Sequence, residues 1–467
     1  MDTSPWKTPD PLAFAAWQAM PPAAAASEVH RRVAALPPPL RQAALAWLLP
    51  EPELAAALEI KEPSTMFARN EKRIGVNPLH QPPQHTAINA PHSRTPTDAL
   101  HPPPLHGVPC FVKDLYDVAG VPTRAGSTFL DAVRPTAGDS RLVRRMRELG
   151  TGIAGKTHMV EFASGLTGEN PHYGDCPHPG FPDRLSGGSS SGSAALVAAG
   201  VVPLALGTDT GGSVRVPAAF CGLYGFRLTP RDEFIRDAFP LSPTMDTAGW
   251  FTGNPGDLLT TWRAMTGAPP HTSSREPHGC YLPGHTLLPE MDAAVDATCS
   301  RAAAGLARRA DDATEMALLS EWKGAVDAYL VIGMSEAHAV HRDWLAPYRG
   351  HYDPAIWQRF DDAGRLPAET IAAARTKFAT VRKVWDQFFQ THDFLVLPCA
   401  PFPALRKSEC TPAARRGILT LTAPASLGGL ACLTLPVSLG GGLTAGLQVI
   451  LSRPDSPAVE WILGKCG

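Results

Sequence analysis

The sequence lacks the features that mark several classes of protein. Only ten of its 467 residues are lysines, although lysine and arginine together number 42, and the net charge is only −2. This balance argues against a nucleic-acid or anionic-membrane partner, which would require a basic face. The nine cysteines are odd in number and have no short paired spacing. They therefore indicate neither a disulfide framework nor a zinc ribbon.

The sequence also has no convincing signal peptide or membrane-spanning segment. The apolar stretch 12–26 is broken by Pro21 and Pro22 and lacks a basic flank. The longest apolar run, 194–206, falls short of the ~20 residues that a membrane span needs and contains Gly200 and Pro203. We therefore expect a soluble, cytoplasmic protein.

A metal site is not expected, and no cofactor is indicated either. Histidines gather in a proline-rich stretch, 78–106, but their spacing matches no standard ligand pattern, so we interpret the stretch as a solvated loop. These histidines are His80, His85, His92, His101 and His106.

With 44% hydrophobic residues the chain can bury a large core, and its pattern divides it in two. Residues 1–70 are predicted to form a helical extension, with helices at Glu28–Leu36 and Leu40–Leu49 separated by prolines. Residues 71–467 are predicted to form one large α/β domain, in which distant segments build a central mixed sheet flanked by helices. The expected strands are Gly107–Val112, Gly152–Lys156, Val201–Leu206, Gly222–Leu228, Phe394–Pro398 and Leu443–Leu451, and the expected helices are Ser140–Leu149, Ser193–Ala199, Ala293–Arg308, Leu318–Ile332 and Glu369–Phe389.

Two Gly/Ser segments, 186–193 and 207–213, adjoin predicted core elements, which is unusual for flexible linkers. The first contains the G-x-S-x-G pattern of a nucleophile elbow around Ser190, but we expect no strand directly before it. The second contains an Asp-Thr-Gly triplet at 209–211 without the second such loop that an aspartic protease needs. Neither segment has the Gly-Lys-Ser/Thr ending of a phosphate-binding loop.

A different interpretation joins both segments to Lys113, which ends an apolar strand. Amide hydrolysis requires a nucleophile, a base and donors for the oxyanion, yet neither segment contains a histidine. A neutral lysine can serve as the base through a bridging hydroxyl if burial lowers its pKa from ~10.4 to ~7–8. The glycines before Ser213 allow backbone N–H groups to converge on one point.

These motifs together resemble the amidase signature family over about residues 65–467. The resemblance rests on 107–114, 155–157, 187–190 and 207–218, and on the spacing of 24 residues between Ser189 and Ser213. It implies that Ser213 is the nucleophile, that Ser189, preceded by a cis peptide bond, relays the proton, and that Lys113 is the terminal base. It also implies that the oxyanion is held by the N–H groups of Thr210, Gly211, Gly212 and Ser213.

Other residues near these motifs are expected to support the structure of the site and not to take part in the reaction. Lys156 fits the second, non-triad lysine of the family, although it remains a rival base. Arg215 is expected to pair with Asp209 or another local acid, and Ser190 to orient a backbone or the substrate amide. Cys110 and Cys221 are expected to serve only in packing.

The amino-acid sequences of the first Gly/Ser segment and of residues 168–174 look most like those of the indole-3-acetamide hydrolase branch of the family. The resemblance therefore implies a serine amidohydrolase that converts a small amide, with an apolar or aromatic acyl group, to an acid and ammonia or an amine. Three alternatives stay open: an ammonia-generating subunit of a multi-subunit amidotransferase, a hydrolase of carbamates, esters or urea derivatives, and a non-catalytic interaction module. The oligomeric state also stays open, with a homodimer as one possibility.

Overall fold

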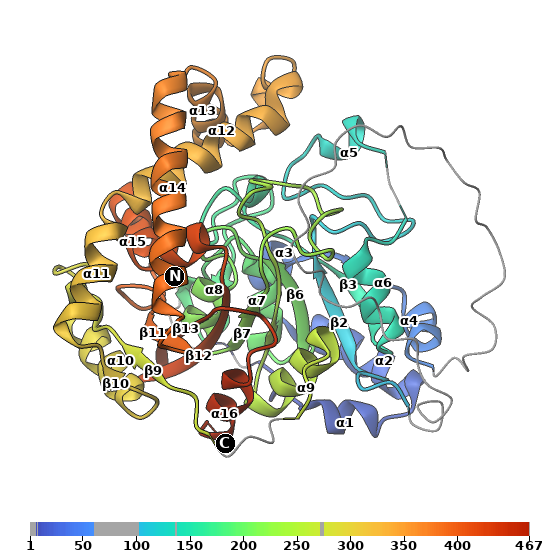
Figure 1. The fold of residues 1–467 in the computed structure, drawn as a ribbon. Coiled ribbons are helices and arrows are strands. Elements are labelled where there is room, and N and C mark those ends of the chain that lie inside the picture. The colour runs from blue at the N-terminus through green and yellow to red at the C-terminus, as the bar shows by residue number, and fades with distance from the viewer. Residues whose placement is uncertain (1–5, 7, 60–101, 136–137, 271–274, 467) are drawn as a thin grey trace, which may run out of the picture.

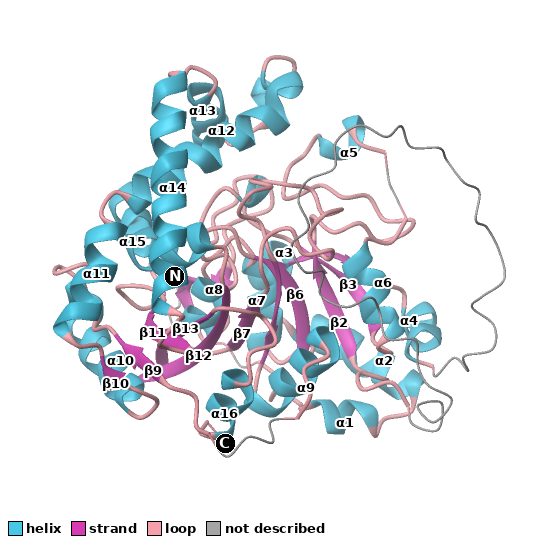
Figure 2. Cartoon of the chain, viewed as in Figure 1, coloured by secondary structure: helices cyan, strands magenta, loops and turns pink. Residues whose placement is uncertain are grey.

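The structure, a computed structural model, describes residues 6, 8–59, 102–135, 138–270 and 275–466. At its centre lies an 11-stranded β-sheet flanked by helices (Figures 1 and 2), which confirms the predicted α/β fold with a central mixed sheet. The strands of this sheet are β1 (Leu45–Leu48), β2 (Pro109–Lys113), β3 (Gly152–Thr157), β6 (Leu204–Thr208), β7 (Tyr224–Arg227), β8 (Ala248–Thr252), β9 (Gly279–Tyr281), β10 (Arg308–Arg309), β11 (Phe394–Pro398), β12 (Ala431–Gly440) and β13 (Leu443–Leu451).

The strand order is β1-β3-β2-β6-β8-β7-β12-β13-β11-β9-β10. Strands β3, β2 and β6 are parallel to one another, as are β11, β9 and β10, while the remaining neighbours are antiparallel. Strands β2 and β6 are buried along their whole length. This burial explains why both read as continuous apolar runs rather than as alternating patterns.

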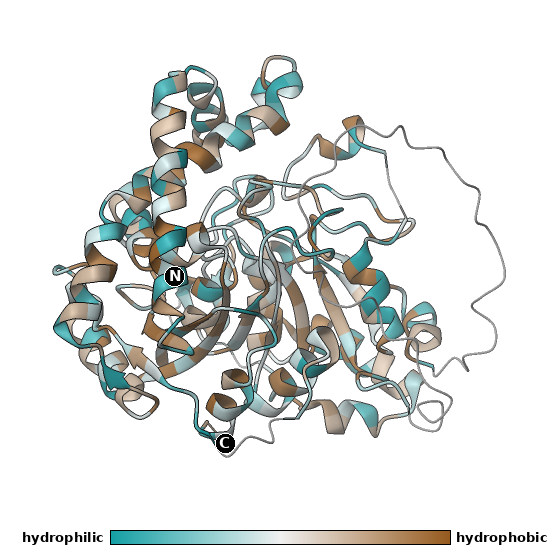
Figure 3. Cartoon of the chain, in the orientation of Figure 1, coloured by the Kyte–Doolittle hydropathy of each residue, from teal (hydrophilic) through white to brown (hydrophobic). Residues whose placement is uncertain are grey.

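The helices pack around this sheet, and Figure 3 shows hydrophobic residues in the strands and along the helix sides that meet them. A separate two-stranded sheet, β4 (Pro177–His178) with β5 (Phe181–Leu185), lies between β3 and α7 in the sequence. The helices are α1 (Phe14–Gln18), α2 (Pro22–Ala35), α3 (Pro38–Ala44), α4 (Glu51–Leu58), α5 (Leu130–Val133), α6 (Arg141–Glu148), α7 (Ser191–Ala198), α8 (Arg215–Cys221), α9 (Pro255–Thr266), α10 (Ala293–Ala304), α11 (Asp312–Trp322), α12 (Ala325–Leu345), α13 (Pro354–Ala363), α14 (Ala368–Phe388), α15 (Pro412–Gly428) and α16 (Ala458–Gly464), with short 3-10 turns at η3 (Glu161–Ala163), η4 (Gly284–Thr286), η5 (Arg349–His351) and η6 (Lys407–Glu409).

The N-terminal segment differs from the prediction in one element. The helix expected over Leu40–Leu49 ends at Ala44, and the chain continues as β1, which pairs antiparallel with β3 at the edge of the sheet. Residues 45–48 form a strand despite their helical spacing, because the edge of β3 offers unpaired backbone groups. The Ala154 carbonyl of β3, for example, accepts from the Leu49 N–H at 2.8 Å. The predicted boundary between residues 70 and 71 lies outside the described residues.

The helical region after β9 contains a second difference. The helix expected over Leu318–Ile332 is divided between α11 and α12, because Gly324 adopts a left-handed conformation with φ of 79°. Helices α12, α13 and α14 then extend away from the sheet (Figure 1). Within the described part of the chain, none of the helices combines the length and apolarity needed to cross a bilayer.

The close pairing of β1 with β3 leads to a prediction for Gly155. A Cβ atom at this position would overlap the Trp47 carbonyl oxygen of β1 and the ring of Phe111. We therefore expect Gly155→Ala to lower the free energy of unfolding by about 2 kcal/mol, as for other overpacked sites. Urea unfolding of this variant and of the control Gly253→Ala, where no atom lies within 4 Å of the added Cβ, measures the difference. Equal midpoints for the two variants would contradict this packing of β1.

Candidate active site

Lys113 is the last residue of β2, and its side chain is fully buried. Its Nζ donates to the Ser189 Oγ at 2.7 Å and to the Thr208 Oγ1 at 2.8 Å. Thr208 ends β6, the strand parallel and adjacent to β2, so the carboxyl ends of the two strands present their side chains together. The sequence did not single out Thr208, which lies in the segment 207–213, two residues after the predicted strand Val201–Leu206; the observed strand extends to it.

Burial lowers the pKa of Lys113 to about 7. The negative charges of Asp209 and Asp246 act in the opposite direction, but removal of the ammonium from water is the larger effect. This pKa of Lys113 lies at the lower end of the range of ~7–8 expected from the sequence. A substantial fraction of Lys113 is therefore neutral near pH 7 and able to accept a proton.

Ser189 lies in the loop between β5 and α7, and the Gly188–Ser189 peptide bond is cis, as the family resemblance implied. The backbone on both sides of this bond is held by one neighbouring segment. The Gly188 N–H donates to the Leu166 carbonyl at 2.9 Å, and the Ser189 carbonyl accepts from the Val160 N–H at 3.1 Å. The hydroxyl of Ser189 is thus presented to Lys113 by a loop with fixed ends.

Ser213 lies in the loop that joins β6 to α8 and is buried. Among the described residues, no hydrogen bond joins its hydroxyl to Ser189 or Lys113. The loop nevertheless borders the Ser189 loop at two points: Ser190 bonds to the Thr208 backbone, and a Cβ at Gly187 would contact Pro217 of α8. Ser213 therefore lies on a segment whose two ends both pack against the Ser189 loop.

The four predicted oxyanion donors differ in their hydrogen bonds. The Gly212 N–H is already donated to the Asp209 Oδ1 at 2.8 Å. The backbone N–H groups of Thr210, Gly211 and Ser213 donate to no acceptor within the part of the chain that the structure describes. A Cβ at Gly211 would overlap the Tyr329 hydroxyl, so this position requires glycine. Of the four predicted donors, Gly212 alone is thus engaged within the described residues.

Asp209 fixes the Ser213 loop from inside through a buried ion cluster. Its carboxylate lies 2.9 Å from Arg215 and 2.8 Å from Arg227, and all three side chains are fully buried. Burial raises the pKa of Asp209, but the two guanidinium groups outweigh it and hold this pKa far below its usual range. The predicted pairing of Arg215 with Asp209 is therefore confirmed.

The elbow interpretation of Ser190 fails, but not for the reason given by the sequence. Contrary to expectation, a strand does precede the segment, namely β5. The prolines and histidine of 177–184 concealed this strand in the sequence. It pairs with β4 and forms a bridge from Arg184 to Arg406, outside the central sheet on which a nucleophile elbow lies. The Ser190 hydroxyl bonds to the Thr208 carbonyl at 3.1 Å and to its N–H at 3.3 Å. It orients backbone, as predicted.

Lys156 is engaged in a different cluster. Its Nζ lies 2.6 Å from the Asp114 Oδ1 and donates to the Thr123 Oγ1 at 2.9 Å, so an ion pair holds it away from a base role.

Burial raises the pKa of the Cys110 thiol, in keeping with a packing role. Among the described residues, no three His, Cys, Asp or Glu side chains gather so as to hold a metal ion. Four of the clustered histidines, His80, His85, His92 and His101, lie outside the described residues.

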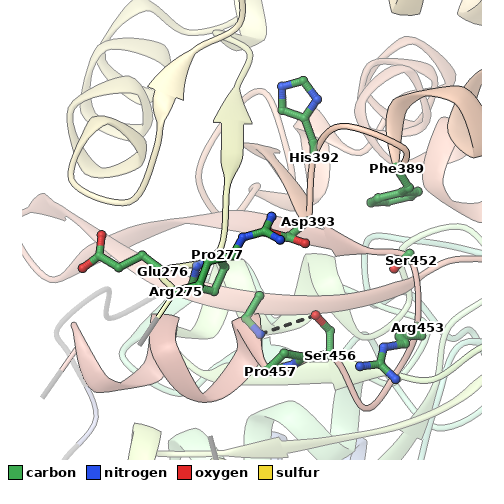
Figure 4. Close-up of a pocket in the computed structure, with 11 residues that line it drawn as sticks. Arg275, Glu276, Pro277, Phe389, His392, Asp393, Ser452, Arg453, Ser456 and Pro457 are labelled. Atoms are coloured by element: carbon green, nitrogen blue, oxygen red, sulfur yellow. Dashed lines mark hydrogen bonds and ion pairs between the residues drawn. The ribbon is translucent and has the colours of Figure 1, made fainter. Parts of the chain in front are cut away.

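A pocket of about 260 Å³ opens elsewhere on the molecule, where β11 begins and β13 ends (Figure 4). Its walls include none of the predicted site residues. The Asp393 carboxylate in this pocket accepts from the His278 N–H at 2.7 Å. The pocket is lined by Arg275, Glu276, Pro277, Phe389, His392, Asp393, Ser452, Arg453, Ser456, Pro457 and Ala458.

The ion cluster predicts a large stability effect at Asp209. Asp209→Asn leaves Arg215 and Arg227 without a buried countercharge, so we expect the free energy of unfolding to fall by about 3–5 kcal/mol. The control is Asp343→Asn, which removes a carboxylate 83% exposed and 3.7 Å from Arg342 and should cost less than about 1 kcal/mol. Urea unfolding measures both variants, and similar losses would contradict a special role for the buried cluster.

Comparison with known proteins agrees with this geometry. The family model described as Amidase matches residues 79–455. The chain is 32% identical over 318 residues to a 1-carboxybiuret hydrolase subunit of Pseudomonas sp. (strain ADP), covering 65% of this chain and 68% of that protein. It is 31% identical over 310 residues to an indoleacetamide hydrolase of Pseudomonas savastanoi, covering 63% and 68%. A crystal structure of an amidase superposes with a TM-score of 0.75 at 27% identity, over 96% of this chain and 97% of the other. The chain therefore belongs to the amidase signature family of hydrolases, which act on amide C–N bonds.

Proposed function

We propose that this chain is a serine amidohydrolase that converts a small carboxylic amide to an acid and ammonia or an amine through an acyl-enzyme on Ser213. The single observation that carries the proposal is the contact between Lys113 and Ser189. A buried amine with a pKa of about 7 lies 2.7 Å from a serine hydroxyl, on a loop packed against the segment that contains Ser213.

In the proposed acylation step, neutral Lys113 takes the proton of Ser189, which in turn takes the proton of Ser213. The Ser213 Oγ attacks the amide carbon, and the negative charge moves to the carbonyl oxygen. Backbone N–H groups of Thr210, Gly211 and Ser213 stabilise that oxygen. The tetrahedral species then releases the amine, which receives the proton back through Ser189.

Deacylation repeats the same proton path with water. Water gives its proton through Ser189 to Lys113 and attacks the ester carbon, after which the acid leaves and Ser213 regains its proton. The path balances because Lys113 takes and returns one proton in each half-reaction. No metal or cofactor takes part in the proposed steps.

A second candidate is an amidase subunit that passes ammonia to a partner chain. The relative from Pseudomonas sp. (strain ADP) is itself named as a subunit, which favours testing this alternative. Ammonia release by the purified chain alone supports the standalone enzyme. Release that appears only when a partner chain is added would favour the subunit.

The nucleophile is tested directly with a fluorophosphonate and mass spectrometry. We expect one adduct, on Ser213, and we expect Ser213→Ala to lose amide hydrolysis by at least about 10³-fold, as in other enzymes that lose their nucleophile. The control Ser438→Ala removes an exposed hydroxyl on β12 and should keep full activity. An adduct on Ser190 would instead favour the elbow interpretation.

The lowered pKa of Lys113 predicts the direction of the pH dependence. The base must be neutral, and the ammonium form accumulates as the pH falls through about 7. With a neutral amide as substrate, kcat/KM should therefore fall about tenfold per pH unit below 7 and level off above it. Lys113→Ala should cost several orders of magnitude. A flat profile between pH 5 and 8, or a near-normal rate in that variant, would place the base elsewhere.

A further inference from the structure

The carboxylate of Asp246 lies beside the nucleophile loop, and the reaction steps proposed above do not use it. Asp246 precedes β8 by two residues and is buried. Its Oδ1 accepts from the Thr210 Oγ1 at 2.6 Å, and its Oδ2 accepts from the N–H groups of Leu241 and Ser242, each at 2.9 Å. All three partners donate to Asp246, so the ionised carboxylate is the form that satisfies them.

Asp246 holds the half of the nucleophile loop that Asp209 leaves unattached. Asp209 accepts from three backbone N–H groups of this loop, all of them at or after Gly212. Thr210 precedes that point, and its N–H is one of the predicted oxyanion donors without an acceptor in the described ranges. The bond from its side chain to Asp246 therefore supplies the attachment that Asp209 does not.

The neighbouring residue, Thr247, fixes the peptide unit to which the Thr210 N–H belongs. The Thr247 Oγ1 donates to the Asp209 carbonyl at 2.7 Å, and the Asp209 N–H donates to the Thr247 carbonyl at 3.0 Å. The peptide bond between Asp209 and Thr210 is trans and planar, so its N–H points opposite to that carbonyl. Thr247 and Asp246 together thus fix the direction of the Thr210 N–H, which points away from Thr247.

The turn that presents Asp246 is itself attached to α12. Glu336 of α12 accepts from the Ser242 Oγ at 2.6 Å and from the Thr244 N–H at 3.0 Å, and it also accepts from the Thr244 hydroxyl. Within the turn, the Asp246 N–H donates to the Ser242 carbonyl at 2.8 Å. A chain of hydrogen bonds therefore runs from α12 through this turn to Thr210.

The charge of Asp246 also reaches the proposed base. Burial lowers the pKa of Lys113, and the negative charge of Asp246 opposes that effect together with that of Asp209. Burial raises the pKa of Asp246, and the like charge of Glu336 acts in the same direction. Two buried phenols, Tyr116 and Tyr329, also interact with the charge of Asp246.

We propose that Asp246 is a positioning residue of the hydrolysis, whose carboxylate holds Thr210 so that the N–H of this residue is aimed at the oxyanion. The inference rests on the proposed function and adds to it a residue that touches neither the substrate nor the nucleophile. A donor that is aimed in advance needs no reorganisation when charge develops on the carbonyl oxygen. The contribution of Asp246 should therefore appear in the transition state and not in substrate binding.

Two variants test the proposal, Asp246→Asn and Thr210→Val, of which the second removes the hydroxyl and keeps the shape. We would measure the rate constant for fluorophosphonate labelling of Ser213, and kcat and KM for ammonia release from phenylacetamide. Both variants should lower the labelling rate and kcat by about 10- to 100-fold, because loss of one whole oxyanion donor costs about 10²- to 10³-fold. KM should stay within about threefold. Thr210→Ser, which keeps the hydroxyl, should recover most of the loss.

The pH dependence of labelling separates the two variants. Asp246→Asn removes a negative charge that favours the ammonium form of Lys113, so the pH below which the rate falls should move to a lower value. Thr210→Val keeps the charge and should lose rate without that shift. An equal shift in both variants would overturn the inference, because general damage to the site would then explain it.

The matched control is Asp257→Asn on α9, which alters a carboxylate that is 7% exposed, against 6% for Asp246. Asp257 accepts from the Phe14 N–H at 3.2 Å and from the Asn254 Nδ2 at 2.6 Å. This variant should keep the wild-type labelling rate and pH profile, and a loss equal to that of Asp246→Asn would contradict a special role for Asp246. If Asp246→Asn does not fold, the comparison of Thr210→Val with Thr210→Ser still decides.

The outcomes separate this inference from the proposed function. Normal labelling of the wild-type protein, with Thr210→Val within about twofold of it, would overturn the role of Asp246 and leave the amidohydrolase intact. Absence of labelling at Ser213 in the wild-type protein, together with no hydrolysis of any amide, would instead overturn the proposed function.

Discussion

The ion cluster of Asp209 with Arg215 and Arg227 is the interaction on which the geometry of the site depends. Asp209 accepts backbone N–H groups from Gly212, Val214 and Arg215, so one carboxylate sets the curvature of the whole Ser213 loop. Arg215 continues the network to the Thr422 carbonyl at 3.0 Å and the Gln448 Oε1 at 2.7 Å. The loop is thereby attached to α15 and β13, more than 200 residues later in the chain.

The same cluster bears on the chemistry of Lys113. A buried carboxylate next to a lysine would ordinarily keep that lysine charged, because the ion pair repays part of the desolvation. Here the charge of Asp209 is shared with two arginines, and its effect on the pKa of Lys113 is smaller than that of burial. Asp209 thus opposes the effect of burial on Lys113 without outweighing it, while the same carboxylate holds the Ser213 loop.

The parts of this site that consist of short, continuous motifs could be predicted from the sequence. Lys113, Ser189 and the segment 207–213 were recognisable because each combines a strand end or a glycine-rich turn with a reactive side chain. Thr208 was missed because its role comes from β6 lying beside β2, and strand order is not written in either segment. β1 was missed because its residues also fit a helix, and only the free edge of β3 decides between the two.

The burial of Arg359 on α13 and of Arg415 on α15 could not be predicted for the same reason. Arg359 and Arg415 are 56 residues apart, and each looks like an ordinary surface arginine of an amphipathic helix. Only the packing of α12 to α15 against one another reveals that their Nε atoms are buried. The burial of an arginine Nε atom is a tertiary property, and no window of sequence contains it.

Burial lowers the pKa of Lys113, Arg359 and Arg415 alike, but the consequence at neutral pH differs between lysine and arginine. Lys113 loses enough basicity to act as a proton acceptor, because an ammonium has an ordinary pKa of ~10.4. Arg359 and Arg415 experience the same kind of environment, yet even a pKa of about 9 at Arg359 keeps its guanidinium charged at neutral pH. The same loss of water contact therefore brings a lysine into the range where it exchanges a proton at neutral pH and leaves an arginine charged.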